Sequence, residues 1–166
     1  MGIKYKTIKD EFPEMIKRME SLNGRKVEVG VLEGENAWLA SIHEYGCNIP
    51  VTPKMRAFLH YHGLHLSKDT KVIRIPERSF LRTGYDENVD DVTKRAGMLI
   101  AQVLDGSISD VELLNEVGRT LSTKIKEYAV DLSSPPNSSY TVEQKGSSNP
   151  LVDSGSMIEG ITWRNK

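Results

Sequence analysis

Residues 86–132, DENVDDVTKRAGMLIAQVLDGSISDVELLNEVGRTLSTKIKEYAVDL, decide the fold because they carry two apolar helical stripes separated by a short turn. Gly106 is suited to end the first helix, and Ser109 with Glu112 forms a capping box at the start of the second. A connection of about four residues predicts an antiparallel αα-hairpin. The stripes recur at three- and four-residue steps and consist of Val89, Val92, Ala96, Leu99 and Val103, then Val111, Leu114, Leu121, Ile125, Tyr128 and Leu132.

Shorter patterns flank this hairpin. Residues 10–22 are amphipathic at helical spacing, and residues 26–32 alternate as a half-buried strand does. Asn36 is placed to cap a short helix that ends at Gly46. Three further short elements are expected at 72–75, 150–158 and 161–164. The sequence therefore predicts an α+β fold, in which a small mixed or antiparallel sheet is packed by an N-terminal helix and the long αα-hairpin, with an extended loop.

Length and composition favour one domain, residues 1–166. The chain is 38% hydrophobic, enough for a core, and no apolar run approaches the roughly 18 residues that a membrane span needs. We therefore expect no membrane association, and the charged start lacks the apolar stretch of an export signal. The single Cys47 cannot form an internal disulfide. A net charge of −1 gives no general affinity for polyanions.

Two segments stand apart from these elements. Residues 47–71 are interpreted as an insertion between strands, because Pro50 and Pro53 bracket an extended piece there and the stretch is rich in histidine. Residues 133–149 are rich in serine and proline and poor in bulky apolar residues, which predicts a flexible arm or loop.

Candidate catalytic and metal-binding residues are few. His43 and Cys47 have the spacing of a helical metal pair, but a cysteine replaces the second histidine of the zinc-peptidase pattern. His60, His62 and His65 suit polar tips on an exposed turn equally well. No nucleotide-binding fingerprint and no nucleophile elbow occurs. We expect no enzyme activity, no cofactor and no metal; a metal-binding hydrolase that uses these side chains is the alternative.

Arg74, Arg78 and Arg82 form a basic row in the sequence, with Phe80 between the last two. Such a row could contact phosphate, which leaves a DNA-binding accessory protein as a second alternative. Its spacing across Pro76 is more typical of a solvated edge or of salt bridges between subunits, since charge runs are weak indicators of nucleic-acid binding.

Three segments in this order and spacing resemble the tail-completion, or head–tail joining, proteins of tailed bacteriophages and prophages. The first is Val27-Glu28-Val29-Gly30-Val31 with the helix that ends His43-Glu44-Tyr45-Gly46, and the second is Ile75-Pro76-Glu77-Arg78-Ser79-Phe80-Leu81-Arg82. The third runs from Pro135-Pro136-Asn137 through Lys145-Gly146 to Pro150-Leu151-Val152-Asp153-Ser154-Gly155. The resemblance covers about residues 25–164.

The resemblance implies a structural virion protein of the neck, which forms a homo-oligomeric ring and joins the tail to the capsid connector. Its implied partners are further copies, a portal or head-closure adaptor, and a tail terminator or tail tube, with DNA passing without sequence specificity. The implied location is the virion, and the bacterial host cytoplasm during assembly. Such a protein needs rigid repeated elements and segments that order on a neighbour.

The expected subunit or partner interface follows from the second and third segments. Ile75 to Arg82 is hypothesised to lie at a seam between subunits, with Pro76 blunting a strand edge. The loop from residue 133 to 149 is expected to become ordered on a neighbouring protein. The interface residues are Arg74, Pro76, Arg78, Phe80, Arg82, Pro135, Pro136, Asn137, Tyr140 and Lys145.

Overall fold

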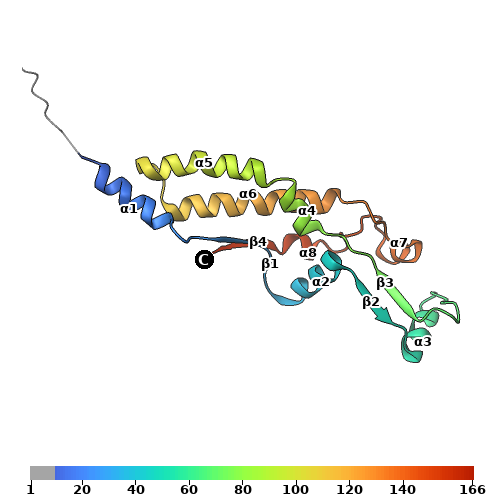
Figure 1. Ribbon diagram of the computed structural model, residues 1–166. Helices are drawn as coiled ribbons and strands as arrows, with labels where there is room; N and C mark the ends of the chain where they lie inside the picture. The colour runs from blue at the N-terminus through green and yellow to red at the C-terminus, as the bar shows by residue number, and fades with distance from the viewer. Residues whose placement is uncertain (1–9) are drawn as a thin grey trace, which may run out of the picture.

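An antiparallel pair of long helices forms the spine of the molecule in the computed structural model, which describes residues 10–166 (Figure 1). Helix α5 (Val89–Asp105) ends at Gly106, whose φ of 84° lies in the left-handed region. Helix α6 (Asp110–Asp131) begins with the expected capping box between Ser109 and Glu112. The α+β class and the αα-hairpin predicted from the sequence are confirmed.

A two-stranded sheet lies along α6. Strands β1 (Val27–Val31) and β4 (Ile161–Asn165) pair antiparallel, with Val29 opposite Trp163. Trp163 of β4 lies directly against α6 at Gly118, where an added Cβ would lie 2.3 Å from the Trp163 ring. The sequence predicted both strands, and the structure adds that they pair with each other alone within residues 10–166.

The core lies where α6, the sheet and two short helices meet. Helix α4 (Phe80–Asp86) inserts Phe80, which is fully buried, and helix α8 (Ser156–Glu159) contributes Met157 and Ile158. Ile125 and Ala129 of α6 complete the centre of this cluster. The α6 helix is the common surface of the core, because seven of its residues are buried.

Helices α1 (Phe12–Leu22) and α2 (Gly34–Tyr45) lie at the margins of this core. α1 packs along α5, and the Arg18 guanidinium donates to the Leu104 carbonyl at 3.0 Å. The prediction that Asn36 caps α2 is wrong, because the helix begins earlier, at Gly34, and the Asn36 side chain donates to the Ser156 carbonyl instead.

An extension, residues 47–75, projects from one end of the body (Figure 1). Strands β2 (Cys47–Pro50) and β3 (Val72–Ile75) pair antiparallel and carry helix α3 (Pro53–Tyr61) at their outer end. Arg56 fastens the returning loop by donating to the carbonyls of Leu66, Ser67 and Thr70. The expected insertion at 47–71 is thus the larger part of a strand–helix–strand unit.

The segment at 133–149, expected as a flexible arm or loop, has secondary structure of its own. It contains helix α7 (Ser139–Lys145), capped by the Ser138 hydroxyl and ended by Gly146 in the left-handed region. The reason is local, since serine at an N-cap and glycine after the last turn stabilise a short helix. None of the helices in residues 10–166 is both long and apolar enough to cross a membrane.

Candidate functional site

Parts of the three segments singled out in the sequence meet at one place in the structure. The end of α2, the turn before α4 and the start of the 133–149 segment surround two buried charged side chains, Arg78 and Glu44, which are 4% and 2% exposed. Gly46 allows the end of α2 to lie close to the backbone of residues 75–77. Its φ is 70°, and an added Cβ would lie 2.9 Å from both the Ile75 carbonyl oxygen and the Glu77 amide nitrogen.

Arg78 joins the body to the 133–149 segment. Its Nε donates to the Pro135 carbonyl at 2.8 Å, and its Nη2 donates to the Pro136 carbonyl at 3.2 Å and to Asn137 Oδ1 at 3.1 Å. The remaining terminal nitrogen lies 3.4 Å from His43 Nδ1. The guanidinium therefore binds carbonyl and imidazole groups in place of a carboxylate, and burial lowers its pKa.

Glu44 holds the first turn of α4. Its two carboxylate oxygens accept from the backbone N–H groups of Leu81 and Arg82, at 2.8 and 3.1 Å. These groups belong to a helix N-terminus, where the unpaired amides and the helix dipole favour a negative charge. The Arg82 Nε adds an ion pair at 2.8 Å. Both oxygens of the buried carboxylate are therefore occupied.

Arg82 covers the Glu44 carboxylate and the start of α4 from the solvent side. It also donates to the Glu44 carbonyl at 3.0 Å and to Glu77 Oε1 at 2.7 Å, and its guanidinium lies 4.8 Å from the centroid of the Tyr45 ring. Hydrogen bonds with Glu44 and Glu77 raise the pKa of Arg82. The arginine is committed to its own chain although its side chain is half exposed.

His43 and Lys145 border the Arg78 side of the site. Burial, followed by the charges of Arg78 and Lys145, lowers the pKa of His43 to about 4. Burial is also the main cause that lowers the pKa of Lys145, against the attraction of Asp153. His43 is therefore neutral at pH 7 and can accept a hydrogen bond from Arg78.

Asn149 closes the other end of the 133–149 segment. Its side-chain oxygen accepts from the backbone N–H groups of Leu151 and Val152, both at 2.9 Å, and its Nδ2 donates to the Val130 carbonyl at 2.6 Å. Asn137 Nδ2 donates to the Asn149 carbonyl. The segment is thus anchored to the body at both ends, through Arg78 and through Asn149.

The structure brings part of the expected interface together inside the chain. Phe80 and Arg78 are buried and do not reach the surface, which corrects the expectation that they form an interface or a solvated basic row. Pro135, Pro136 and Asn137 bind Arg78. Lys145 borders the site and donates to the Asn149 carbonyl. The other three make no contact with Arg78: Arg74 is exposed, Pro76 is half-buried, and Tyr140 donates to the His62 carbonyl.

The histidines do not gather with Cys47. His43 faces Arg78, whereas His60 and His65 lie in the extension with their Nδ1 atoms 2.7 Å apart. Within residues 10–166 no group of three or more His, Cys, Asp or Glu side chains could hold a metal ion.

Two residues of the site were not among the interface residues expected from the sequence, Glu44 and Asn149. One sign was available for Glu44, because it follows Ala40 by one helical turn and shares its buried face. Asn149 precedes Pro150, and asparagine there suits a turn whose side chain caps the following amides.

The arrangement is suited to holding segments in place. Each polar group of Arg78 and Glu44 is bonded to backbone or to a neighbouring side chain of the same chain, which leaves neither of them as a free acid or base. No protein-family model, curated protein or solved structure matches this chain.

Proposed function

We propose that this chain is a structural phage virion protein of the head–tail connection, without enzyme activity, which forms a ring between the capsid connector and the tail. The observation that supports it best is the meeting of the three resemblance-bearing segments around Arg78 and Glu44. The buried polar groups of these segments hold one another in fixed positions. An assembly protein needs buried polar groups for this purpose.

The surface of the molecule is in keeping with this role. Large apolar side chains are exposed at both ends and along the body, and exposed apolar patches mark interaction surfaces. Those on α1 lie at spacings of four and three residues, which places them on one stripe. The exposed side chains include Phe12, Ile16 and Met19 on α1, Trp38 and Tyr45 on α2, and Phe58 and Tyr61 on α3.

The proposed partners are further copies of the chain, a portal or head-closure adaptor, and a tail terminator or tail tube, with DNA passing through the ring. The proposed location is the neck of the virion. A ring fits one end of the elongated chain meeting a different surface of its neighbour, because such heterologous contacts close into rings when the rotation allows.

The test is made in the phage or prophage that encodes the chain. A stop codon early in the reading frame should leave DNA-filled capsids and free tails that do not join, seen by negative-stain electron microscopy. Supplying the wild-type chain in trans should restore joined particles that contain it, detected by mass spectrometry of purified virions. Normal particles without the chain would contradict the proposal.

A further inference from the structure

Strand β1 has a free hydrogen-bonding edge. Lys26 and Lys166 exchange both backbone hydrogen bonds, N to O at 2.9 and 2.8 Å. Hydrogen-bonded pairs alternate along an antiparallel ladder, so the N–H and C=O groups of Val27, Val29 and Val31 point away from β4. Within residues 10–166 no other strand pairs with β1. Such an edge is a template for a strand from another chain.

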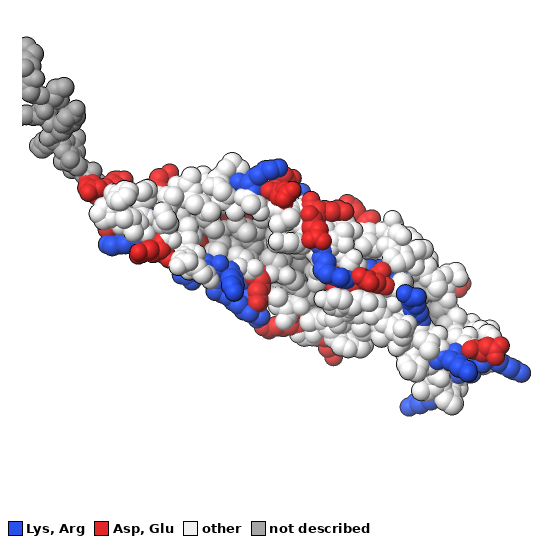
Figure 2. Space-filling model, in the orientation of Figure 1, with Lys and Arg blue, Asp and Glu red and all other residues white. Residues whose placement is uncertain are grey.

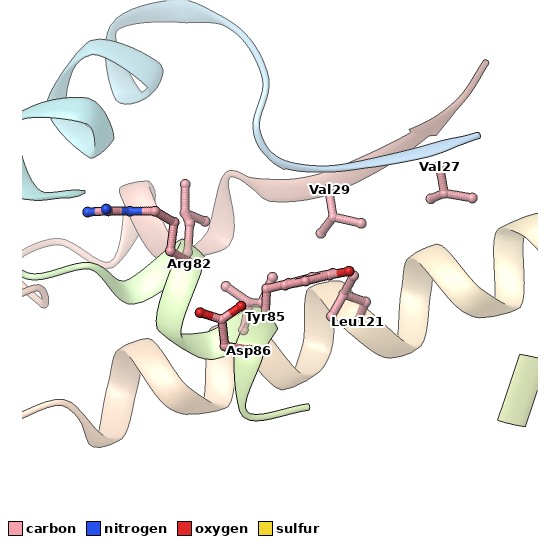
Figure 3. Close-up of a pocket in the computed structure, with 8 residues that line it drawn as sticks. Val27, Val29, Arg82, Tyr85, Asp86 and Leu121 are labelled. Carbon is pink, nitrogen blue, oxygen red and sulfur yellow. The ribbon is translucent and has the colours of Figure 1, made fainter. Parts of the chain in front are cut away.

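An apolar groove of about 470 Å³ lies beside this edge, between β1 and α4, with α6 at its base. Figure 3 shows Val27 and Val29 pointing from β1 toward the space that Tyr85 and Leu121 border from the other side. Asp86 lines the groove and begins the acidic run Asp86, Glu87, Asp90 and Asp91. The groove can therefore hold the side chains of a strand that pairs with β1.

The extension carries a strand that fits. The Val51 amide donates to the Lys71 carbonyl at 2.8 Å, so by the same alternation Val72 and Arg74 of β3 direct their backbone groups away from β2. Both side chains are exposed in the free chain. The outer edge of β2 is blunted by Pro50, which has no N–H to donate.

Pleating sets which side chains of β3 would enter the groove. Residues directly opposite in a hydrogen-bonded pair place their side chains on the same face of the sheet. If Val72 and Arg74 pair with β1, their side chains lie on the face of Val27 and Val29, toward α6. The apolar Val72 then meets the groove wall, and the basic Arg74 faces a groove that Asp86 also lines.

Charge favours the same partner. Residues 51–74 hold five Lys and Arg and one Asp, and Figure 2 shows Lys and Arg gathered at the outer end of the extension. Residues 83–93 hold four acids and no Lys or Arg. Arg82, which also lines the groove, is already paired with Glu44 and Glu77. The extension projects away from its own β1 (Figure 1), so the two surfaces suit different copies.

Given the ring assembly proposed above, on which this inference rests, we propose that strand β3 of one copy pairs with the free edge of β1 of the next. Its Val72 and Arg74 side chains occupy the groove between β1 and α4. The contact is head to tail, so each copy uses both surfaces, and repetition generates the ring.

The first experiment removes one backbone N–H group. Val72→Pro deletes a backbone N–H that the β2–β3 ladder does not use. Val72→Ala is the matched control, because it shortens the side chain but keeps that N–H. Sedimentation velocity and native mass spectrometry of the full chain should show association weakened at least about tenfold for Val72→Pro relative to Val72→Ala. Equal association of both variants, or a wild-type chain that stays monomeric, would overturn the proposal.

The second experiment tests the head-to-tail geometry. Tyr85→Arg places a cation in the groove and should block docking of the basic strand, whereas Tyr85→Phe keeps the apolar wall and should associate normally. Val72→Pro and Tyr85→Arg chains should each be monomeric alone but form a 1:1 heterodimer when mixed, since each retains one intact surface. Circular dichroism verifies that both variants are folded. Absence of the heterodimer would overturn the proposal.

The outcomes separate this contact from the proposed function. A ring that persists in Val72→Pro, found in joined virions, would overturn the strand contact and leave the head–tail role intact. If the chain paired through β3 but was absent from virions, the strand contact would stand and the head–tail role would be overturned. A third outcome is that the chain binds a duplex DNA fragment in a salt-sensitive way, that Lys68→Glu and Lys71→Glu abolish this binding, and that Val72→Pro still assembles fully. The extension would then bind nucleic acid, and the proposal would be overturned.

Discussion

The body and the extension of this molecule are held together in different ways. α6 alone has seven buried residues, and the core around Phe80 draws on five helices and β4. The extension has no fully buried residue between positions 47 and 75. It relies on the β2–β3 ladder and on the carbonyls that Arg56 binds. The body is therefore stabilised by apolar burial, whereas the extension is an ordered unit that can be altered without unfolding the body.

Two phenylalanines give the largest expected contrast. Phe80→Ala removes a fully buried ring from the main core and should lower the free energy of unfolding by about 3–5 kcal/mol. Phe58→Ala, in a side chain 60% exposed on α3, should change it by less than about 0.5 kcal/mol. Chemical denaturation followed by circular dichroism measures both. Similar losses would mean that the extension contributes to the global core.

The polar anchor comes next in expected size. Arg78→Ala leaves the carbonyls of Pro135 and Pro136 without their buried donor and should cost about 3 kcal/mol. Arg74→Ala is the matched control, because that arginine is exposed on the extension and should cost less than about 0.5 kcal/mol.

Hydrogen exchange shows where Arg78→Ala acts. The amides of α7 and of residues 133–138 should lose protection more than those of α5, because Arg78 binds the start of that segment. Uniform loss of protection would mean that Arg78 supports the whole core and not the anchor in particular.

The contrast also shows what could be predicted from the sequence. The αα-hairpin, Gly106 and the Ser109–Glu112 capping box were predictable because each depends on residues a few positions apart. The pairing of β1 with β4 was not, because the strands are separated by most of the chain and their alternation names no partner.

The candidate site was harder to predict for the same reason. Arg78 looked like one member of a solvated basic row, but its acceptors in residues 135–137 lie 57 to 59 positions away in the sequence, and only the fold brings them together. The segments of the site were identified, whereas the burial of Arg78 and the role of Glu44 depend on how α2, α4 and residues 135–137 approach one another.

His43 predicts a pH dependence for the stability of the body. Its pKa is lowered from 6.5 to about 4 in the folded chain, mainly by burial, so between these values the unfolded chain binds the extra proton. The contribution of His43 to stability is present above pH 6.5 and is lost as pH falls toward 4. At pH 5 the loss should be about 1 kcal/mol after solvent screening.

His43→Gln is the matched variant, because glutamine does not titrate and its carbonyl can accept from Arg78. The difference in unfolding free energy between wild type and His43→Gln should change between pH 7 and pH 5. Identical profiles for wild type and His43→Gln would contradict the assigned pKa.

Arg56 gives the smallest and most local expected effect. Its guanidinium donates to three carbonyls of the loop between α3 and β3, at 2.6 to 3.1 Å. Arg56→Ala should raise hydrogen exchange in residues 62–71, while the free energy of global unfolding changes by less than about 1 kcal/mol. Arg56→Lys, with one compact ammonium, cannot reach all three carbonyls in fork geometry and should restore only part of the protection. If Arg56→Ala instead destabilised the chain as much as Arg78→Ala, the extension would be part of the cooperative core. Its separation from the body, on which the contrast between the two regions depends, would then be wrong.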